Sequence, residues 1–173
     1  MGPRPGARGR VPERVVSAGW SSPSAQERRA VLERTHSVAI VGASAKPSRA
    51  SYFVASYLLS SSDLRVFFVN PVVDEILGHP VYPSLTALPE PPDLVDVFRR
   101  PSEVPAVLDE AIEVGAGSFW LQLGLWDEDV ARRGTEAGLT VVMNRCLKIE
   151  HARFAGGLHL AGFDTGVITS RRR

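Results

Sequence analysis

Residues 37–44 read SVAIVGAS, a short apolar run that stops at a glycine followed by two small residues. A continuous apolar run of this length is typical of a strand buried on both faces, as strands of parallel sheets are. A glycine directly after such a strand indicates a tight turn. We expect a helix to follow at residues 51–60. The segment therefore predicts the first strand and turn of an α/β domain.

Apolar runs and helical patterns alternate along the rest of the chain. The expected strands are 37–41, 64–69, 94–98, 118–121 and 139–143, and the expected helices are 25–34, 51–60, 103–114 and 127–137. This alternation requires parallel strands joined by right-handed crossovers. The prediction is one doubly wound, five-stranded parallel sheet of order 3-2-1-4-5, a Rossmann-like fold with helices on both faces. The proline-rich stretch 72–92 is expected to be irregular, with one helical turn at 84–88.

Length and composition indicate a single globular domain. The chain has 173 residues, of which 44% are hydrophobic and 23% charged, values that allow a packed core. We expect a flexible N-terminal extension over 1–22, the domain over 23–154 and a C-terminal extension over 155–173. No apolar run approaches the roughly 18 residues that suggest a membrane span. Cys146 is the one cysteine, which is typical of a reducing, cytoplasmic setting.

The charge of the chain is unevenly distributed. Residues 1–14 carry +3 and residues 171–173 carry another +3, so that 15–170 carry −5 within a net charge of +1. A nucleic-acid-binding domain gathers its basic residues on one face of the fold. Basic ends on an acidic body do not have that pattern, so we expect a small-molecule ligand and neither nucleic acid nor a membrane as partner.

The predicted fold indicates where a ligand would bind. Open parallel sheets bind ligands outside the carboxyl ends of their strands, near the point where the strand order reverses. Most of the strand ends carry polar side chains, and the loop after the first strand adds two cations. The candidate binding residues are Gly42, Ala43, Ser44, Lys46, Arg49, Asn70, Pro71, Phe98, Arg99, Gln122, Asn144, Arg145 and Cys146.

The loop that starts at Gly42 has the composition of a phosphate site. A glycine lets backbone N–H groups approach a phosphate, the next helix offers the positive end of its dipole, and Lys46 and Arg49 can neutralise charge. Ser44 and Pro47 stand where the dinucleotide motif G-x-G-x-x-G has its second and third glycines. The second strand ends at Asn70 rather than at an acidic residue that would hold a ribose. A plain βα turn and an NAD(P) site both remain alternatives at this point.

Several segments in one order resemble a known family. They are VAIVGASAKPSRASYFVASYLL, FFVNP, ILGHPVYPSL, DLVDVFRRPSEVPAVLDEAIEVGAGSFWLQLGLW and AGLTVVMNRCLKIEH, which together span about residues 36–151. In these segments the chain is similar to the stand-alone CoA-binding proteins, whose domain resembles that of succinyl-CoA synthetase α subunits. The resemblance implies coenzyme A as the ligand.

The resemblance also implies a path for that ligand over the strand ends. Residues 42–44 would take the pyrophosphate, with Lys46 and Arg49 adding charge. Asn70 and Pro71 would border the adenosine, and Phe98 and Arg99 would line the crevice below the pantetheine arm. Gln122 and residues 144–146 would close the far end. The family often has a lysine directly after the Asn-Pro pair, where this chain has Val72.

The residues favour a binding protein over an enzyme. His36, His79, His151 and His159 all lie away from the predicted strand exits, and no Ser/His/Asp or metal-ligand spacing occurs. We expect a non-catalytic carrier, sensor or regulatory module, for which a homodimer is one expected state. The alternatives are an NAD(P)-dependent oxidoreductase-like enzyme and an interaction domain with a vestigial nucleotide site. Cys146 is either a small core residue or a thiol near the sulfur of the ligand.

Overall fold

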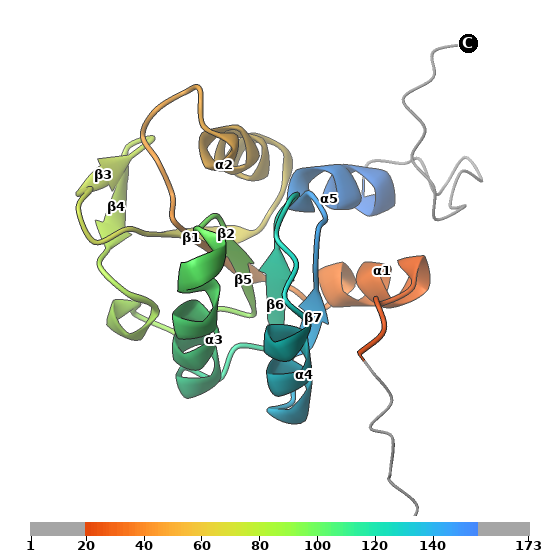
Figure 1. The fold of residues 1–173 in the computed structure, drawn as a ribbon. Helices are drawn as coiled ribbons and strands as arrows, with labels where there is room; N and C mark the ends of the chain where they lie inside the picture. Colours follow the sequence, from red (N-terminus) through yellow and green to blue (C-terminus); the bar gives the residue numbers. More distant parts are fainter. Residues whose placement is uncertain (1–19, 156–173) are drawn as a thin grey trace, which may run out of the picture.

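The computed structural model describes residues 20–155, which form one sheet between two layers of helices (Figure 1). Nearly all of the expected extensions, 1–22 and 155–173, lie outside the described residues. The strands are β1 Ser37–Val41, β2 Arg65–Val69, β3 Glu75–Ile76, β4 His79–Tyr82, β5 Leu94–Val97, β6 Ser118–Leu121 and β7 Thr140–Val142. The helices are α1 Ala25–Glu33, α2 Ala50–Ser61, α3 Val104–Glu113, α4 Glu128–Glu136 and α5 Leu147–Ala155, with 3₁₀ turns η1 Leu85–Ala87 and η2 Pro101–Glu103.

The α/β class is as predicted, but the number and order of the strands are not. The sheet has seven strands in the order β3-β4-β2-β1-β5-β6-β7, whereas we expected five in the order 3-2-1-4-5. The strand expected to be third, at 94–98, is β5, and it pairs with β1 on the side opposite to β2. The place expected for it beside β2 is taken by β4.

The error arose in the proline-rich stretch 72–92, which contains two short strands. β4 pairs in parallel with β2 and antiparallel with β3, and a two-residue turn joins β3 to β4. Leu77 and Gly78 in that turn have φ values of 50° and 76°, as the type I′ turns of hairpins require. Exposed His79 and Pro80 begin β4, so the strand has no apolar run that the sequence could reveal. Counted with β4, the parallel strands have the doubly wound order 3-2-1-4-5-6.

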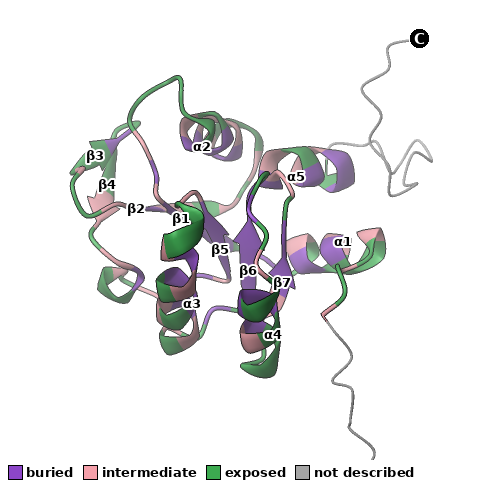
Figure 2. Cartoon of the chain, in the orientation of Figure 1, coloured by how far each residue is buried: buried purple, intermediate pink, exposed green. Residues whose placement is uncertain are grey.

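The helices cover both faces of the sheet, each over its own apolar cluster. Helices α3 and α4 pack over one cluster, while α1, α2 and α5 pack over the other. The central strands are buried on both sides, and the outer helix surfaces are exposed (Figure 2). This double burial explains why β1, β5 and β6 appear in the sequence as largely apolar runs, which Asp96 interrupts in β5.

Helix α1 begins where the sequence indicates, because Ser24 and Glu27 form a capping box. The last helix, α5, is not among the helices predicted from the sequence. Its inner face carries the charged residues Glu150 and Arg153, which hide the apolar periodicity of the helix. Glu150 accepts a 3.0 Å hydrogen bond from buried Arg28 of α1, and this ion pair joins α5 to the first helix.

Candidate functional site

A cleft of about 660 Å³ lies at the carboxyl ends of the parallel strands. Nine of the thirteen candidate residues line it, and they come from the ends of five strands and from the loop after β1. They are Gly42, Ala43, Ser44, Arg49, Asn70, Phe98, Arg99, Gln122 and Cys146. Residues far apart in the sequence therefore meet at one edge of the sheet, as a doubly wound fold requires.

The other four candidates do not line this cleft. Lys46 is an exposed residue of the loop after β1. Pro71 lines a second hollow of about 430 Å³, which shares Gly42 and Arg99 with the cleft. Asn144 accepts a hydrogen bond from the Gly124 N–H at 2.8 Å. Arg145 accepts one at its carbonyl from the Trp120 indole. Asn144 and Arg145 thus hold the loops after β6 and β7 in place.

Gly42 is required by close packing of the backbone. Its φ is +84°, in the left-handed region that favours glycine. A Cβ built on Gly42 would stand 2.2 Å from the Phe98 carbonyl oxygen, so no side chain fits between the ends of β1 and β5. Because Gly42 has no side chain, these strand ends can approach each other. No side chain stands at Gly42, where the two hollows meet.

The N–H groups of the loop after β1 are largely used inside the protein. Those of Gly42 and Ala43 both donate to the Val69 carbonyl, at 3.0 and 3.3 Å. The Ser44 N–H donates to the Ser51 hydroxyl oxygen at 3.1 Å. A phosphate here would therefore be met by the first residues of α2, where Ala50 and Ser51 line the cleft, and by hydroxyl groups.

Three cations surround this end of the cleft. Arg49 lines it, and Lys46 is three residues away; within residues 20–155 neither side chain forms an ion pair. Arg99 is bound by Glu103 at 2.7 Å, which offsets part of its charge. The positive end of α2 and the two unpaired cations make this end attractive to an anion.

Asn70 supports the loop with its side chain. Its Nδ2 donates to the Ala43 carbonyl at 2.8 Å, and its Oδ1 accepts from the Val72 N–H at 2.9 Å. The asparagine thereby fixes the end of β2 to the loop after β1. Both polar atoms of the Asn70 side chain, Nδ2 and Oδ1, thus form hydrogen bonds within the protein. A ligand would contact Asn70 through the part of the residue that remains accessible.

A buried carboxyl group lies behind the middle of the cleft. Asp96 of β5 is fully buried, and its Oδ1 accepts a hydrogen bond from Gln122 Nε2. Its Oδ2 has no hydrogen-bond partner among the described residues. Burial raises the pKa of Asp96 to about 8, although the Gln122 hydrogen bond opposes the shift. The same bond orients Gln122, whose Oε1 then remains available as an acceptor.

The far end of the cleft is apolar, and sequence reasoning assigned little of it. Leu123 and Leu125 come from the loop after β6 and Ile149 from α5, while Phe53 lies on the first turn of α2 and borders both ends of the cleft. Leu123 lies in a predicted strand exit but has no polar group, which is the sequence signal of a binding residue at a strand end. Ile149 could not be found while α5 was unrecognised. Half-buried Cys146 lies between the polar and apolar parts of the lining.

Other chemically active groups are separate from the cleft. Within residues 20–155, no three His, Cys, Asp or Glu side chains are grouped to hold a metal. His36 and His79 are exposed, and His151 shares a 3.0 Å hydrogen bond with the Tyr57 hydroxyl; His159 lies outside the described residues. Burial lowers the pKa of His151. No helix in the described part of the chain is long and apolar enough to cross a membrane.

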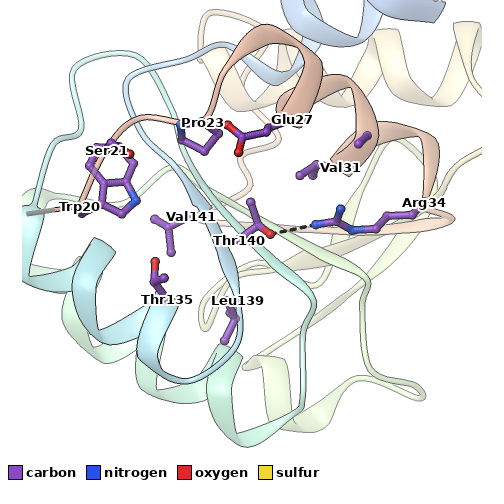
Figure 3. A pocket seen from close by; sticks show the side chains of 11 residues that line it. Trp20, Ser21, Pro23, Glu27, Val31, Arg34, Thr135, Leu139, Thr140 and Val141 are labelled. Atoms are coloured by element: carbon purple, nitrogen blue, oxygen red, sulfur yellow. Dashed lines mark hydrogen bonds between the residues drawn. The ribbon is translucent and has the colours of Figure 1, made fainter. Parts of the chain in front are cut away.

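A third cavity, of about 560 Å³, lies beside β7 and shares no residue with the cleft (Figure 3). Its lining includes Trp20, Glu27 and Val31 from the N-terminal part and Thr135 and Val141 from the region of α4 and β7. The Arg34 guanidinium crosses it and donates to the Thr140 hydroxyl at 2.9 Å. None of the candidate residues lies there.

Comparison with known proteins agrees with the segments quoted from the sequence. A relative from Bacillus subtilis (strain 168), named uncharacterized protein YneT, is 38% identical over 131 residues, covering 76% of this chain and 96% of the relative. The solved structure of a hypothetical protein from Pyrococcus horikoshii OT3 is 36% identical, covers 78% of this chain and 94% of that one, and has a TM-score of 0.72.

A more distant match is part of a larger protein. The dinucleotide-forming acetyl-coenzyme A synthetase 1 of Ca. Korarchaeum cryptofilum is 25% identical with a TM-score of 0.58, over 61% of this chain and 25% of the synthetase. A family described as the CoA binding domain matches residues 36–152. This match spans most of the chain and nearly coincides with the segments at 36–151, so the chain belongs to the CoA binding domain family.

Proposed function

We propose that the chain binds coenzyme A, free or as a thioester, across the carboxyl ends of its strands. One observation carries the proposal: a single cleft joins a cationic end at α2 to an apolar end at the loop after β6. Coenzyme A has the matching order of parts, since phosphates lie at one end and a thiol on a long, weakly polar arm at the other. Membership in the family supports this ligand.

The phosphates would lie at the start of α2. Ala50 and Ser51 stand at its first turn, and Arg49 lies beside them in the cleft. Negative charge is stabilised at a helix N-terminus and by hydrogen bonds from arginine. Lys46 is close in sequence and adds long-range attraction. The N–H groups of Gly42 and Ala43 would contribute through the shape of the loop rather than as donors.

The adenosine would occupy the second hollow. Pro71, Ser84 and Ser102 line it, and it meets the cleft at Gly42 and Arg99. A ligand whose phosphates lie at α2 can thus extend past Gly42, which has no side chain to block it, into this hollow. Asn70 and Pro71 would border the adenosine, as the resemblance implies.

The pantetheine arm would run the other way, past Phe98 toward Gln122. The pantetheine arm carries two amides. The Gln122 Oε1 can accept a hydrogen bond from one of their N–H groups, because Gln122 Nε2 already donates to Asp96. Beyond it lies Cys146, close to where the thiol would end. The arrangement supports binding more directly than chemistry, since the three histidines in the described part of the chain, His36, His79 and His151, do not line the cleft. A carrier, sensor or regulatory role is therefore proposed.

Thermal unfolding with a series of ligands tests the proposal. A ligand at about 100 times its Kd adds about 2.7 kcal/mol of stability, which gives a clear rise in Tm. Coenzyme A and acetyl-CoA are expected to raise the Tm, whereas NAD and ATP are not. A shift with NAD alone would support an oxidoreductase-like protein instead. No shift with any of the four would favour an interaction domain with a vestigial site.

A further inference from the structure

Exposed apolar side chains gather at the far end of the cleft. The described residues include six large hydrophobic side chains that are exposed, and three of them line this cleft. These three are Phe53, Leu123 and Ile149, with exposures of 60%, 64% and 43%. Apolar groups that converge in one place on a surface indicate a binding site, whereas single ones do not.

The three side chains are brought together by different elements. Phe53 is on the first turn of α2, Leu123 follows β6, and Ile149 is on the first turn of α5. They line the same cleft as buried Leu125 and half-buried Cys146. The apolar end is thus built by the fold, at the exits of β6 and β7, and is not the exposed face of one helix.

The charged side chains of the cleft come from one part of its lining. Among residues 20–155, Arg49 and Arg99 are the only charged residues that line it, and they belong to the loops after β1 and β5. Lys148 is the nearest cation in sequence to the apolar end, and its ammonium stands 3.4 Å from the centre of the Phe53 ring. The ring faces that charge as a cation–π partner. The lining itself offers no charge to a ligand at this end.

The order of the strand exits links the two ends. From the loop after β1 the cleft passes β5 and then β6 and β7. On the proposed function, the phosphates lie at the first of these exits and the arm passes Gln122 at β6. The next residue is Leu123, so a group attached to the sulfur of the ligand would reach Leu123, Cys146 and Ile149. That group in a thioester is the acyl chain.

We infer that the chain selects CoA thioesters with a short, uncharged apolar acyl chain, which packs on Leu123, Ile149 and Phe53. The inference rests on the proposed function and adds the class of ligand. Acyl carbons that cover these side chains remove apolar surface from water on both partners. A carboxylated acyl chain would bring a negative charge between the apolar side chains of Leu123 and Ile149 and would lose hydration there. Lys148, whose ammonium stacks on the Phe53 ring, would offset this cost only by leaving that ring.

Isothermal titration of the full chain with CoA, butyryl-CoA and succinyl-CoA tests this. Butyryl-CoA is expected to bind on the order of tenfold more tightly than CoA, since each buried methylene contributes favourably and the site is partly open. Succinyl-CoA is expected to bind no more tightly than CoA. The variants Leu123→Ser and Ile149→Ser are expected to move the butyryl-CoA to CoA affinity ratio toward one. Both side chains are exposed, so the fold tolerates the change.

Val72→Ser is the matched control, because Val72 is 84% exposed and lines none of the cavities described above. It should leave the affinity ratio unchanged. Equal affinities for CoA and butyryl-CoA would overturn the inference while leaving the proposed function intact. If succinyl-CoA bound most tightly of the three, the inference would also be overturned, and the result would indicate that Lys148 binds the succinyl carboxylate. Failure of CoA itself and of both thioesters to bind would overturn the proposed function, and the inference with it.

Discussion

At the scale of single residues, the loop after β1 carries two cations that no carboxylate within residues 20–155 neutralises. Arg49 lines the cleft, and Lys46 lies in the same loop. Arg99 differs because Glu103 holds it. An unpaired arginine beside a helix N-terminus is available to a phosphate without first breaking an ion pair. Arg49 is therefore expected to be the principal phosphate contact among the three.

Replacing Arg49 should weaken coenzyme A binding. Charge-assisted hydrogen bonds contribute roughly 1.5–3 kcal/mol, so Arg49→Ala is expected to raise the Kd by about tenfold or more. Arg132→Ala is the control, since Arg132 lies on α4 and binds Asp129 and Glu136 at 3.4 and 3.3 Å. Titration calorimetry of both variants measures the effect. Equal Kd values for the two variants would show that Arg49 does not contact the ligand.

Asp96 makes stability depend on pH. Burial raises its pKa from the ordinary 3.8 to about 8. Between these values the folded chain keeps a proton that the unfolded chain has released, so the free energy of unfolding falls as pH rises. The fall is at most about 1.4 kcal/mol per pH unit and stops above the folded pKa. Asp96→Asn removes this contribution.

Urea unfolding of the native chain and of Asp96→Asn at pH 5 and pH 8 checks this prediction. The asparagine variant should gain stability relative to the native chain as pH increases. His151, whose pKa is lowered by burial, is common to both proteins and cancels in the difference. A difference that does not change with pH would mean that Asp96 is already ionised in the fold at pH 5.

At the scale of elements, the turn between β1 and α2 depends on Gly42. Gly42→Ala is expected to destabilise the fold more than Gly138→Ala. Both glycines have positive φ, +84° and +93°, so alanine costs roughly 1–2 kcal/mol of strain at either. Only at Gly42 would the new Cβ meet a backbone oxygen at 2.2 Å, whereas nothing lies within 4 Å at Gly138.

Urea denaturation of the two variants measures this difference. The expected order of stability is the native chain, then Gly138→Ala, then Gly42→Ala. The Gly42 variant should also bind coenzyme A more weakly, since the ends of β1 and β5 must separate to admit the methyl group. Equal losses of stability in the two variants would contradict the close packing of these strand ends.

The elements that could be predicted from sequence are those buried on both sides or clearly capped. Strand β6, Ser118–Leu121, has the bounds predicted for it, and α1 follows from the capping residue Ser24. Strand β4 could not be predicted, because it is a partly exposed strand near the edge of the sheet and begins with His79 and Pro80. Its absence from the prediction produced the wrong strand order. Helix α5 was hidden by its inward-facing charged residues.

The residues of the candidate site were likewise predictable from the sequence only in part. The polar residues of the cleft could be found, because a parallel sheet gathers its strand exits at one edge. Their individual contacts could not be derived, and Asn70 and Asn144 prove to support loops. The apolar residues Phe53 and Ile149 carry no sequence signal that separates them from ordinary helix positions. Only the packing of α2 and α5 beside one another brings them to the cleft.

At the scale of the whole molecule, the sheet order explains why one elongated site exists. The chain reverses direction across the sheet at β1, with β2 on one side and β5 on the other. The two hollows meet there, at Gly42 and Arg99, one beside helices α2 and α5 and the other beside α3. An elongated ligand can therefore have its phosphates at the reversal point and one part on each side. Coenzyme A fits this division, and the family match supports it.

A crystal structure of the chain grown with coenzyme A tests this account most directly. We predict phosphates at the first turn of α2 beside Arg49, adenosine in the hollow at Pro71, and the thiol between Gln122 and Cys146. Coenzyme A bound in the cavity beside β7, or with its phosphates at the apolar end near Leu123, would contradict the account.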